Sequence, residues 1–428
     1  MKPVLPRFLI SPFARSTLAV VAAGVLAACS SAGTSSTGGQ TSVISSTGPI
    51  TIGASLSLTG TFSADGVAFE RGYELWASDV NASGGIDGRH VKLTILDDQS
   101  LPNLVVTNYQ KLFGADHVDL AFGPFSSLLT APASLVAAQY GMAFVEGAGG
   151  APSVFDTPSN QADHNVFDVS LPVADELVPF VNWIASLPAG ERPTTAAYPM
   201  AQDPFADPPV QLAQTLLQKL GLQTVYTNIF PSVVSAYKAP ADQVAATRAQ
   251  VVVLGSTDVP TVSAFMQAFE QQHYTPKLFI AAAGPDQGLA FTSVVGIGNA
   301  NGMMVPNGWF PGYRNAVSQK MVREYVARYG GQVSGVNADV AEAYSVGQVV
   351  EQAVKATGGT DNSKIISFLH SGVRLTSVQG PVKFDALGEN GAAAAFIFQW
   401  QQGSFNQVLP TGTAGSVGII STKPPWAS

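Results

Sequence analysis

Residues 50–99 constrain the fold of this chain more than any other stretch. Apolar residues alternate with small and polar ones over residues 50–56, a pattern typical of a buried strand. From residue 69 to residue 80, apolar side chains recur at helical spacing with charged residues between them, and Gly84 and Gly85 follow where this amphipathic helix ends. A second strand is predicted at residues 91–96. The unit therefore predicts a right-handed crossover that joins two parallel strands.

The same alternation of strands and helices continues to residue 145 and restarts near residue 194. Two such series predict two lobes, each with its own mostly parallel, doubly wound α/β sheet flanked by helices. The helix between residues 229 and 251 is poorly signalled, and residues 241–249 are its best candidate. The other predicted elements are strands at 118–122, 142–145, 194–198, 224–229, 251–254 and 277–281, and helices at 105–113, 128–140, 210–220, 259–272, 317–329 and 339–356.

Three short motifs carry a resemblance to a known family. They are Ile-x-Ile-Gly-x-x-x-x-Leu-Thr-Gly at 50–60, Asn-x-x-Gly-Gly-Ile-x-Gly-Arg at 81–89 and Asp-Asp-Gln-Ser-x-Pro at 97–102. Together they resemble the extracytoplasmic solute-binding proteins of ABC importers, in particular the group that binds branched-chain amino acids, amides and urea. Matching features recur as far as Trp400, so the resemblance covers nearly the whole mature chain. It implies a periplasmic binding protein type I fold.

The resemblance also implies that the chain crosses three times between the lobes, which makes a hinge. It places the first two crossings at 166–171 and 302–306, and assigns the last to segments 380–385 and 396–400. The resulting division gives residues 50–169 and 306–378 to lobe 1, and residues 170–305 and 379–428 to lobe 2.

The first 49 residues predict export and anchoring rather than a folded domain. Three basic residues precede an apolar run at 18–28, which is too short for a membrane span of about 20 residues, so residues 1–28 are interpreted as a signal peptide. The sequence Leu26-Ala27-Ala28-Cys29 resembles a bacterial lipobox, which implies cleavage before Cys29 and a lipid on its sulfur. The alternative is an ordinary secretory peptide with a chance cysteine. Residues 29–49 are rich in Ser, Thr and Gly and predict a flexible tether. The protein is therefore expected outside the cytoplasm, anchored by its lipid to a bacterial cell membrane, either on the outer face or in the periplasm.

Composition limits the partners of the mature protein. The chain has a pI near 5.1, and removal of residues 1–28 leaves 18 basic and 29 acidic residues. A nucleic-acid partner needs a basic surface that this chain lacks, so none is expected. Cys29 is the only cysteine, which excludes an internal disulfide.

Ligands of open parallel sheets bind beyond the carboxyl ends of the strands, and residues 123–127 occupy such a place. Backbone N–H groups and the hydroxyls of Ser126 and Ser127 there are suited to a carboxylate. In the amino-acid-binding relatives this turn holds the ligand carboxylate, and Ser127 is the matching serine. The alternative is a helix N-cap that satisfies only its own helix.

The next strand end, residues 144–150, contributes Ala148 and Gly150 to the predicted ligand site. Relatives often carry a hydroxyl residue at the position of Gly150, and its absence argues against an α-amino-acid ligand. Glu146 is a carboxylate at a buried strand end, where a small residue is expected. It is either a second polar contact or part of a structural ion pair.

The remaining predicted ligand-binding residues come from other loops. Gly284-Pro285-Asp286 resembles the family's Gly-Pro-Glu, whose acid pairs with the ligand ammonium, although an Asp after Gly-Pro is often only a turn residue. Phe205 falls where relatives place an aromatic wall, and Thr257 where they place a tyrosine. Asp65 and Phe62 lie in the loop after the first strand and face the cleft. For the aromatic residues, simple core packing is the default interpretation.

No catalytic constellation is present in the sequence. There is no Gly-x-Ser-x-Gly, His-Glu-x-x-His or Gly-x-x-x-x-Gly-Lys-Ser/Thr motif, and the five histidines are not at metal-ligand spacing. The protein is therefore not expected to be an enzyme, and neither a cofactor nor a metal is predicted.

The resemblance implies the substrate-binding component of an ABC importer, which captures a small polar or amphipathic solute by hinge closure and delivers it to permease subunits in the membrane. An amino acid, an amide, urea and an aromatic acid all remain candidate ligands. The alternatives are an extracellular sensor of the same fold that signals to a partner protein and, less favoured, an exported hydrolase.

Overall fold

The structure of the protein is a computed structural model that describes residues 48–313, 315–413 and 415–427. The predicted signal peptide, Cys29 and the tether up to residue 47 lie outside the described residues. Residues 47–428 form one unit by their contacts, and both sheets belong to it. Within the described residues, no helix combines the length and the apolar character needed to cross a membrane.

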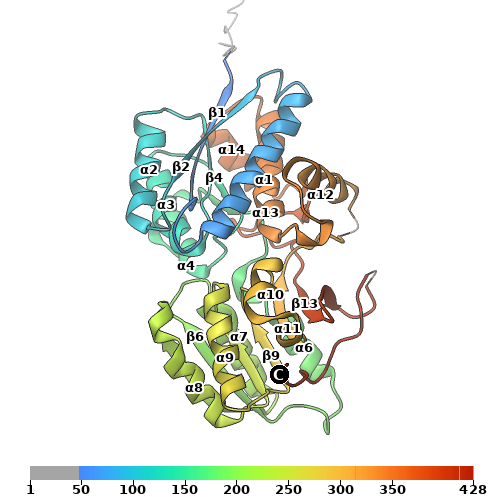
Figure 1. Cartoon of the computed structure of the whole chain (residues 1–428). Coiled ribbons are helices and arrows are strands. Elements are labelled where there is room, and N and C mark those ends of the chain that lie inside the picture. The colour runs from blue at the N-terminus through green and yellow to red at the C-terminus, as the bar shows by residue number, and fades with distance from the viewer. Residues whose placement is uncertain (1–47, 314, 414, 428) are drawn as a thin grey trace, which may run out of the picture. The chain divides into compact units, whose positions relative to one another are not determined.

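The first sheet has five parallel strands in the order β2-β1-β3-β4-β5 (Figure 1). Ile50 lies opposite Val91 in the register of β1 and β2, which confirms the predicted parallel crossover. The apolar side chains of β1 all belong to one buried cluster, and they are those of Ile50, Ile52, Ala54 and Leu56. Gly53, at an alternate position, lies beside Leu112 and Val118, which belong to a second cluster. The strands are β1 (Ile50–Leu56), β2 (Val91–Asp97), β3 (Leu120–Phe122), β4 (Phe144–Glu146) and β5 (Val166–Asp168).

Helices cover both faces of this sheet. On one face α1 and α13 pack against each other so closely that Gly347 of α13 lies directly beside the indole ring of Trp76 in α1. Pro102 begins α2, because a proline in the first turn loses no helical hydrogen bond. The helices are α1 (Ser63–Ala82), α2 (Pro102–Gly114), α3 (Ser127–Gln139), α4 (Pro152–Phe155), α5 (Pro158–Asp163), α12 (Ala316–Tyr329), α13 (Ala338–Thr357) and α14 (Asn362–Leu369).

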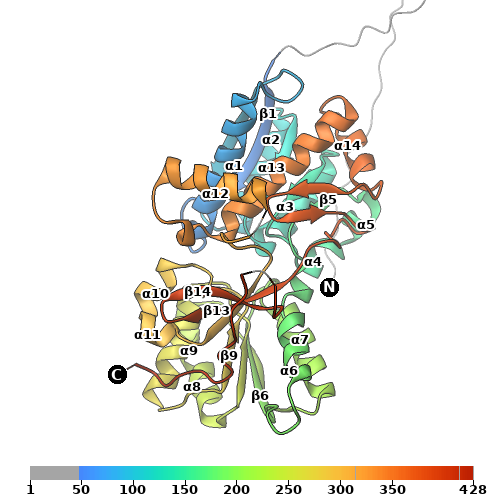
Figure 2. The same cartoon turned by 90° about the vertical axis from the view of Figure 1, so that its right-hand side faces the viewer.

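The second sheet has seven strands in the order β14-β13-β10-β9-β8-β6-β7, and Figure 2 shows its last two strands, β13 and β14. The strands from β10 to β7 are parallel, whereas β13 and β14 form an antiparallel hairpin beside β10. The sheet is thus mostly parallel, as predicted. The strands are β6 (Thr195–Ala201), β7 (Gln223–Phe230), β8 (Val251–Leu254), β9 (Leu278–Ala281), β10 (Met303–Asn307), β13 (Phe396–Gln401) and β14 (Ser404–Leu409).

The poorly signalled helix of this lobe is α8 (Lys238–Thr247). It begins before the predicted residue 241 and ends earlier than 249, because Arg248 adopts a left-handed conformation with φ 54°. The other helices are α6 (Val178–Ser186), α7 (Asp207–Lys219), α9 (Val259–Gln271), α10 (Leu289–Val295) and α11 (Ile297–Ala300), and short 3₁₀ turns occur at Val173–Asp175, Val234–Ala236 and Val333–Gly335.

The last passage between the lobes lies later than the expected boundary after residue 378. Strands β11 (Leu375–Ser377) and β12 (Gly380–Val382) form a small antiparallel sheet, and Val382 and Phe384 pack in the core of the first lobe. The backbone N–H of Asp168 donates to the carbonyl of Gly388 at 2.9 Å. Residues 379–390 therefore lie with the first sheet, and the chain reaches the second sheet only at β13.

Candidate functional site

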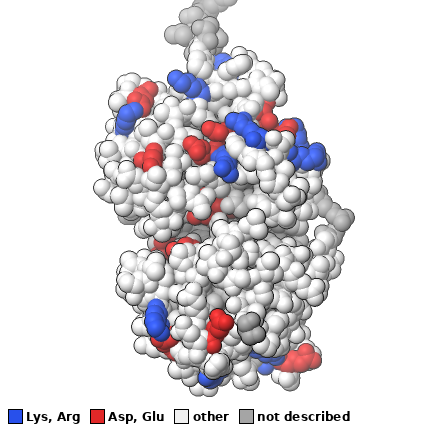
Figure 3. Space-filling view, in the orientation of Figure 1, with Lys and Arg blue, Asp and Glu red and all other residues white. Residues whose placement is uncertain are grey.

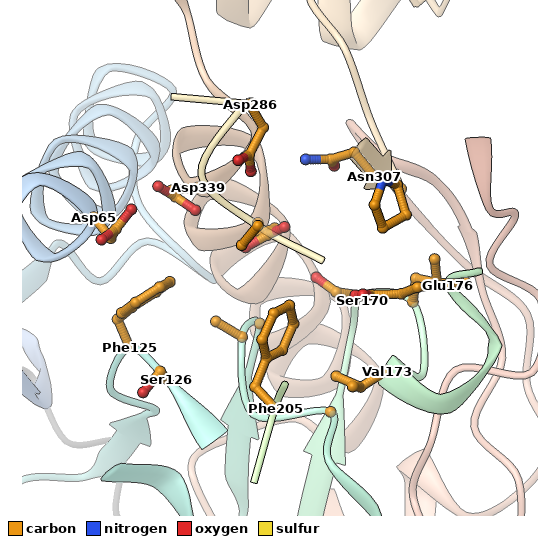
Figure 4. A pocket seen from close by; sticks show the side chains of 18 of the residues that line it. Asp65, Phe125, Ser126, Ser170, Val173, Glu176, Phe205, Asp286, Asn307 and Asp339 are labelled. Atoms are coloured by element: carbon orange, nitrogen blue, oxygen red, sulfur yellow. The ribbon is translucent and has the colours of Figure 1, made fainter. Parts of the chain in front are cut away.

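A cavity of about 810 Å³, counted with the part that opens to solvent, lies between the two sheets. Its walls are loops that follow the carboxyl ends of parallel strands in both lobes, together with the first turns of α13. Figure 3 shows acidic side chains in the hollow between the two halves of the described unit. Figure 4 shows how the side chains from these separate segments point toward one another. The topology thus places the cavity where a sheet of this kind binds ligands.

Seven of the eight predicted ligand-binding residues line this cavity, and Ser127 does not. Phe62 also lines it. Ligand contact by each of these residues stays a prediction. The seven lining residues are Asp65, Ser126, Ala148, Gly150, Phe205, Thr257 and Asp286.

The two serines of the β3–α3 turn have different environments. Ser127 is fully buried, and its hydroxyl oxygen accepts a 3.3 Å hydrogen bond from the backbone N–H of Ala151. Ser126 is the N-cap residue of α3, but its side chain makes no capping hydrogen bond. Its hydroxyl is buried without a hydrogen-bond partner among the described residues. Ser126 is therefore the serine of this turn that lines the cavity, with a hydroxyl left without a partner among the described residues, while Ser127 ties two loops together.

Glu146 is bound by its own loop rather than by a basic residue. Its Oε2 atom accepts hydrogen bonds from the backbone N–H groups of Ala148 at 2.9 Å and Gly149 at 2.5 Å. Burial and the neighbouring charge of Asp168 raise the pKa of Glu146 well above its usual range. The sequence allowed Glu146 to be either a second polar contact or part of a structural ion pair. Among the described residues, the structure shows no ion pair for Glu146.

Gly150 is required by the close approach of Asp168. A Cβ atom at this position would lie 2.5 Å from Oδ2 of Asp168, which lines the same cavity. A residue with a hydroxyl therefore has no room here unless the Asp168 carboxylate moves. The missing hydroxyl noted in the sequence is thus the consequence of an acid that occupies its space.

Asp286 serves as a turn residue and lines the cavity at the same time. Its Oδ1 atom accepts a 2.8 Å hydrogen bond from the backbone N–H of Gly284, as expected for an aspartate in a tight turn. The next residue, Gln287, reaches across to the other lobe, where its Nε2 donates to Oδ1 of Asp65 at 2.6 Å. Asp286 and Asp65 are near enough for the charge of Asp286 to raise the pKa of Asp65.

Four further acids line the cavity and were not identified from the sequence. Asp168 ends β5, Glu176 follows the turn at Val173–Asp175, and Asp339 and Glu342 lie in the first turns of α13. A weak signal was present, because Asp339 and Glu342 are three residues apart on a helix whose neighbouring positions are apolar. The lining amides Gln287, Asn307 and Gln379 carried no such signal.

Burial dominates the electrostatics of these acids. It raises the pKa of Asp65 and of Asp168 to about 7 and that of Asp286 to about 6. Burial and the charges of neighbouring carboxylates raise the pKa values of Asp339, Glu342 and Glu176 well above their usual range. Desolvation and like charges both disfavour the ionised form, so these carboxyl groups compete for protons near neutral pH.

The described residues that line the cavity provide no compensating positive charge. Of the described lining residues, none is a lysine, an arginine or a histidine. The ion pairs formed by described residues lie elsewhere and are at least partly exposed. No three His, Cys, Asp or Glu side chains in this part of the chain are arranged to hold a metal ion. Among the described lining residues the donors are hydroxyls and amides, and none of them is positively charged.

Comparisons with known proteins agree with this architecture. A family model described as periplasmic binding protein matches residues 49–404. An amino acid binding protein of Pseudomonas aeruginosa is 23% identical over 84% of this chain and 92% of its own length. A Leu/Ile/Val-binding protein homolog of Brucella abortus is 36% identical over 93 residues, which are 22% of this chain and 25% of that protein. The chain thus matches about a quarter of the length of that relative.

Solved structures show the same fold. The branched-chain amino acid transporter substrate-binding protein LivJ of Streptococcus pneumoniae, in complex with isoleucine, has a TM-score of 0.72 and 17% identity over 88% of this chain and all of its own. A solute-binding protein of an ABC transporter from R. palustris, in complex with benzoate, has a TM-score of 0.71 and 17% identity over 88% of this chain and 98% of its own. The similarity of this chain to both proteins is a similarity of fold.

Two lobes with a cavity between the carboxyl ends of their strands define a solute-binding protein rather than an enzyme. This chain belongs to the periplasmic binding protein family, with the type I fold. The family places it outside the cytoplasm.

Proposed function

We propose that this protein is the solute-binding subunit of an ABC importer, which closes over a small polar or amphipathic solute and presents it to a membrane permease. The observation that supports this most is the bond from Gln287 to Asp65, because it joins the lobes directly at the rim of the cavity. Micromolar affinity, about −8 kcal/mol, is sufficient for this role. Part of the intrinsic binding energy shifts the lobes toward the closed form.

Calorimetric titration of the purified protein tests solute capture. The panel contains neutral amino acids, amides, urea, aromatic acids and amines, and at least one is expected to bind with micromolar affinity. Uptake of that solute is then measured in the source bacterium with and without this gene. Loss of uptake on deletion, and its return on complementation, is the expected result. Binding without any change in uptake would contradict the importer role.

The proposal includes a lipid anchor on Cys29, supported by the sequence Leu26-Ala27-Ala28-Cys29 that precedes and includes it. A tether of 20 residues of this composition has a root-mean-square reach of roughly 25 Å, enough to hold the lobes near a permease. Cys29→Ser is expected to abolish incorporation of labelled palmitate and to release the protein from the membrane fraction. Unchanged labelling of the variant would remove Cys29 as the attachment site.

A further inference from the structure

The cavity holds more carboxyl groups than a neutral solute requires. Six carboxyl groups line it and come from five separate segments, and within the described chain no basic side chain lines it with them. The six are Asp65, Asp168, Glu176, Asp286, Asp339 and Glu342. A buried carboxylate is costly unless a positive charge or hydrogen-bond donors compensate it. The compensation must therefore come from protons or from the ligand.

Several buried oxygens in the lining have no hydrogen-bond partner among the described residues. They include Oδ2 of Asp168, a residue that is 0% exposed, and Oγ of Ser126, a residue that is 8% exposed. Oε2 of Glu176 is a third. Buried polar atoms are nearly always hydrogen-bonded in folded proteins, so these atoms indicate positions that a donor-bearing ligand satisfies.

One part of the lining that offers backbone donors to an anion, the loop after β4, is already occupied. The backbone N–H groups of Ala148 and Gly149 donate to the Glu146 carboxylate, and the space beside Gly150 is filled by Asp168. A ligand carboxylate placed there meets an acid instead of free donors. This arrangement favours a ligand that is rich in donors and positively charged.

The carboxyl groups form two sets. Figure 4 shows Asp65, Asp339 and Asp286 on one side of the cavity, and Glu176 on the other side next to Ser170, with Phe205 projecting between them. Asp168 belongs to the same side as Glu176, because its Oδ1 accepts a 2.8 Å hydrogen bond from the backbone N–H of Ser170. Burial, and then the charges of Asp168, Asp286 and Asp65, raise the pKa of Glu342.

The lining also contains apolar side chains, among them Phe125, Phe205, Leu171 and Val173. An aliphatic chain fits such a wall, and a cation beside an aromatic face is stabilised. The acids are also too dispersed to coordinate one metal ion, because no three of the described His, Cys, Asp or Glu side chains converge as ligands.

We propose that the cavity binds a small organic dication, in which two ammonium or guanidinium groups joined by a short aliphatic chain reach the two sets of carboxylates. This inference rests on the proposed function as a solute-binding protein and names its solute class. The ligand replaces protons as the compensating charge.

Binding is therefore coupled to proton release. The raised pKa values of the lining acids fall when a cation arrives, so the dication binds more tightly at pH 8 than at pH 6. Two further acids lie near Asp168. Glu146 is its neighbour in the register of β4 and β5, and burial and the charge of Asp168 raise the pKa of Glu146. The charge of Glu389 adds to burial in raising the pKa of Asp168. Calorimetry in two buffers of different ionisation enthalpy, phosphate and MOPS, measures this release directly.

The decisive experiment titrates the full chain with 1,3-diaminopropane, 1,4-diaminobutane, 1,5-diaminopentane and agmatine, and with butylamine, leucine, benzoate and Ca²⁺ for comparison. At least one dication is expected to bind ten times more tightly than butylamine, with a heat that depends on the buffer. Butylamine of equal affinity would overturn the two-charge assignment. Binding of Ca²⁺ and of none of the amines would overturn the proposal that the ligand is an organic cation.

The comparison ligands separate this inference from the proposed function. If leucine or benzoate binds and the diamines do not, the proposal of a dication ligand is wrong and the proposed function in solute capture is retained. If nothing in the two panels binds, both proposals fail. Each outcome is read from the same titration.

Variants at the two sets locate the two charges. Asp168→Asn and Asp339→Asn are each expected to weaken the best dication at least tenfold, while the melting temperature of the free protein rises because a buried like charge is removed. A folding defect would lower the melting temperature instead. Glu191→Gln, an exposed change of the same charge far from the cavity lining, is the matched control. Unchanged dication affinity in both Asp variants would overturn the assignment.

Discussion

The Nε2 atom of Gln287 lies 2.6 Å from Oδ1 of Asp65, although 222 residues and a change of lobe separate them. Asp65 lies in the first turn of α1, and Gln287 precedes α10, so the bond links the start of α1 to the loop after β9. Both residues line the cavity. A conformation in which the lobes separate must break this bond, which makes it a direct reporter of closure.

Gln287→Ala is expected to weaken ligand binding, because closure then loses a hydrogen bond to a carboxyl group. Hydrogen bonds to charged groups contribute about 1.5–3 kcal/mol, so the dissociation constant rises about tenfold or more. The measurement is calorimetry with the solute found by the titration panel. Gln218→Ala removes an amide that bonds to Thr224 within one lobe and leaves affinity unchanged. Equal affinities for the two variants would show that the bond plays no part in closure.

Gly150→Ser is expected to destabilise the protein, because its Cβ would lie 2.5 Å from Oδ2 of Asp168. Overpacking of this kind costs about 1–3 kcal/mol in the free energy of unfolding. Urea denaturation measures the loss. Gly190→Ser places the same side chain where nothing lies within 4 Å and is the control.

The double variant Gly150→Ser/Asp168→Ala tests the cause of that loss. Removal of the carboxylate opens the space, so the stability lost in Gly150→Ser is expected to return in part. A double variant that is as unstable as the sum of the two single ones would contradict the steric explanation.

The sequence predicts the framework well because its signals are local. The period-two pattern of residues 50–56 and the helical spacing of residues 69–80 each follow from one element, and the parallel pairing of Ile50 with Val91 follows from their order. Element boundaries shift by a few residues where capping decides them, as at α8.

The predicted site is incomplete for a different reason. Asp168 ends a strand at the first crossing between the lobes, and Asp339 lies in the first turn of a helix that follows the second crossing. Both line the cavity, but no local sequence pattern predicts this. Ser126 and Ser127 are neighbours, and only the rotation of the first helical turn decides that Ser126 lines the cavity while Ser127 bonds to Ala151. The turn that folds Ala148 and Gly149 back onto Glu146 is likewise a tertiary feature.

The free protein is expected to lose stability as the pH rises from 5 to 8. Burial raises the pKa of Asp65 and Asp168 to about 7 and of Asp286 to about 6, above their value of 3.8 in an unfolded chain. The folded state therefore binds more protons, and the stability present at low pH is lost as the pH passes through 6 and 7. Differential scanning calorimetry at pH 5, 6, 7 and 8 measures the melting temperature.

A control variant distinguishes the cavity acids from the rest of the surface. Asp168→Asn is expected to flatten this pH dependence, while Glu191→Gln, whose side chain is exposed, keeps the slope of the wild type. A melting temperature that rises from pH 5 to pH 8 in the wild type would show that these acids are not buried in the free protein.

Gly347→Ala tests whether the packing of α13 on α1 positions the cavity acids. The added Cβ would lie 2.2 Å from Cδ2 of Trp76, and α13 carries Asp339 and Glu342 into the cavity. Overpacking costs about 1–3 kcal/mol, and the gain in helix propensity from Gly to Ala offsets about 1 kcal/mol of it, so a net loss of up to about 2 kcal/mol is expected in urea denaturation. Gly335→Ala, where a Cβ meets nothing within 4 Å, is the control. Because the first turns of α13 shift with the helix, ligand affinity falls along with stability in Gly347→Ala, whereas a stability loss with wild-type affinity would show that the acids are held by their own loops.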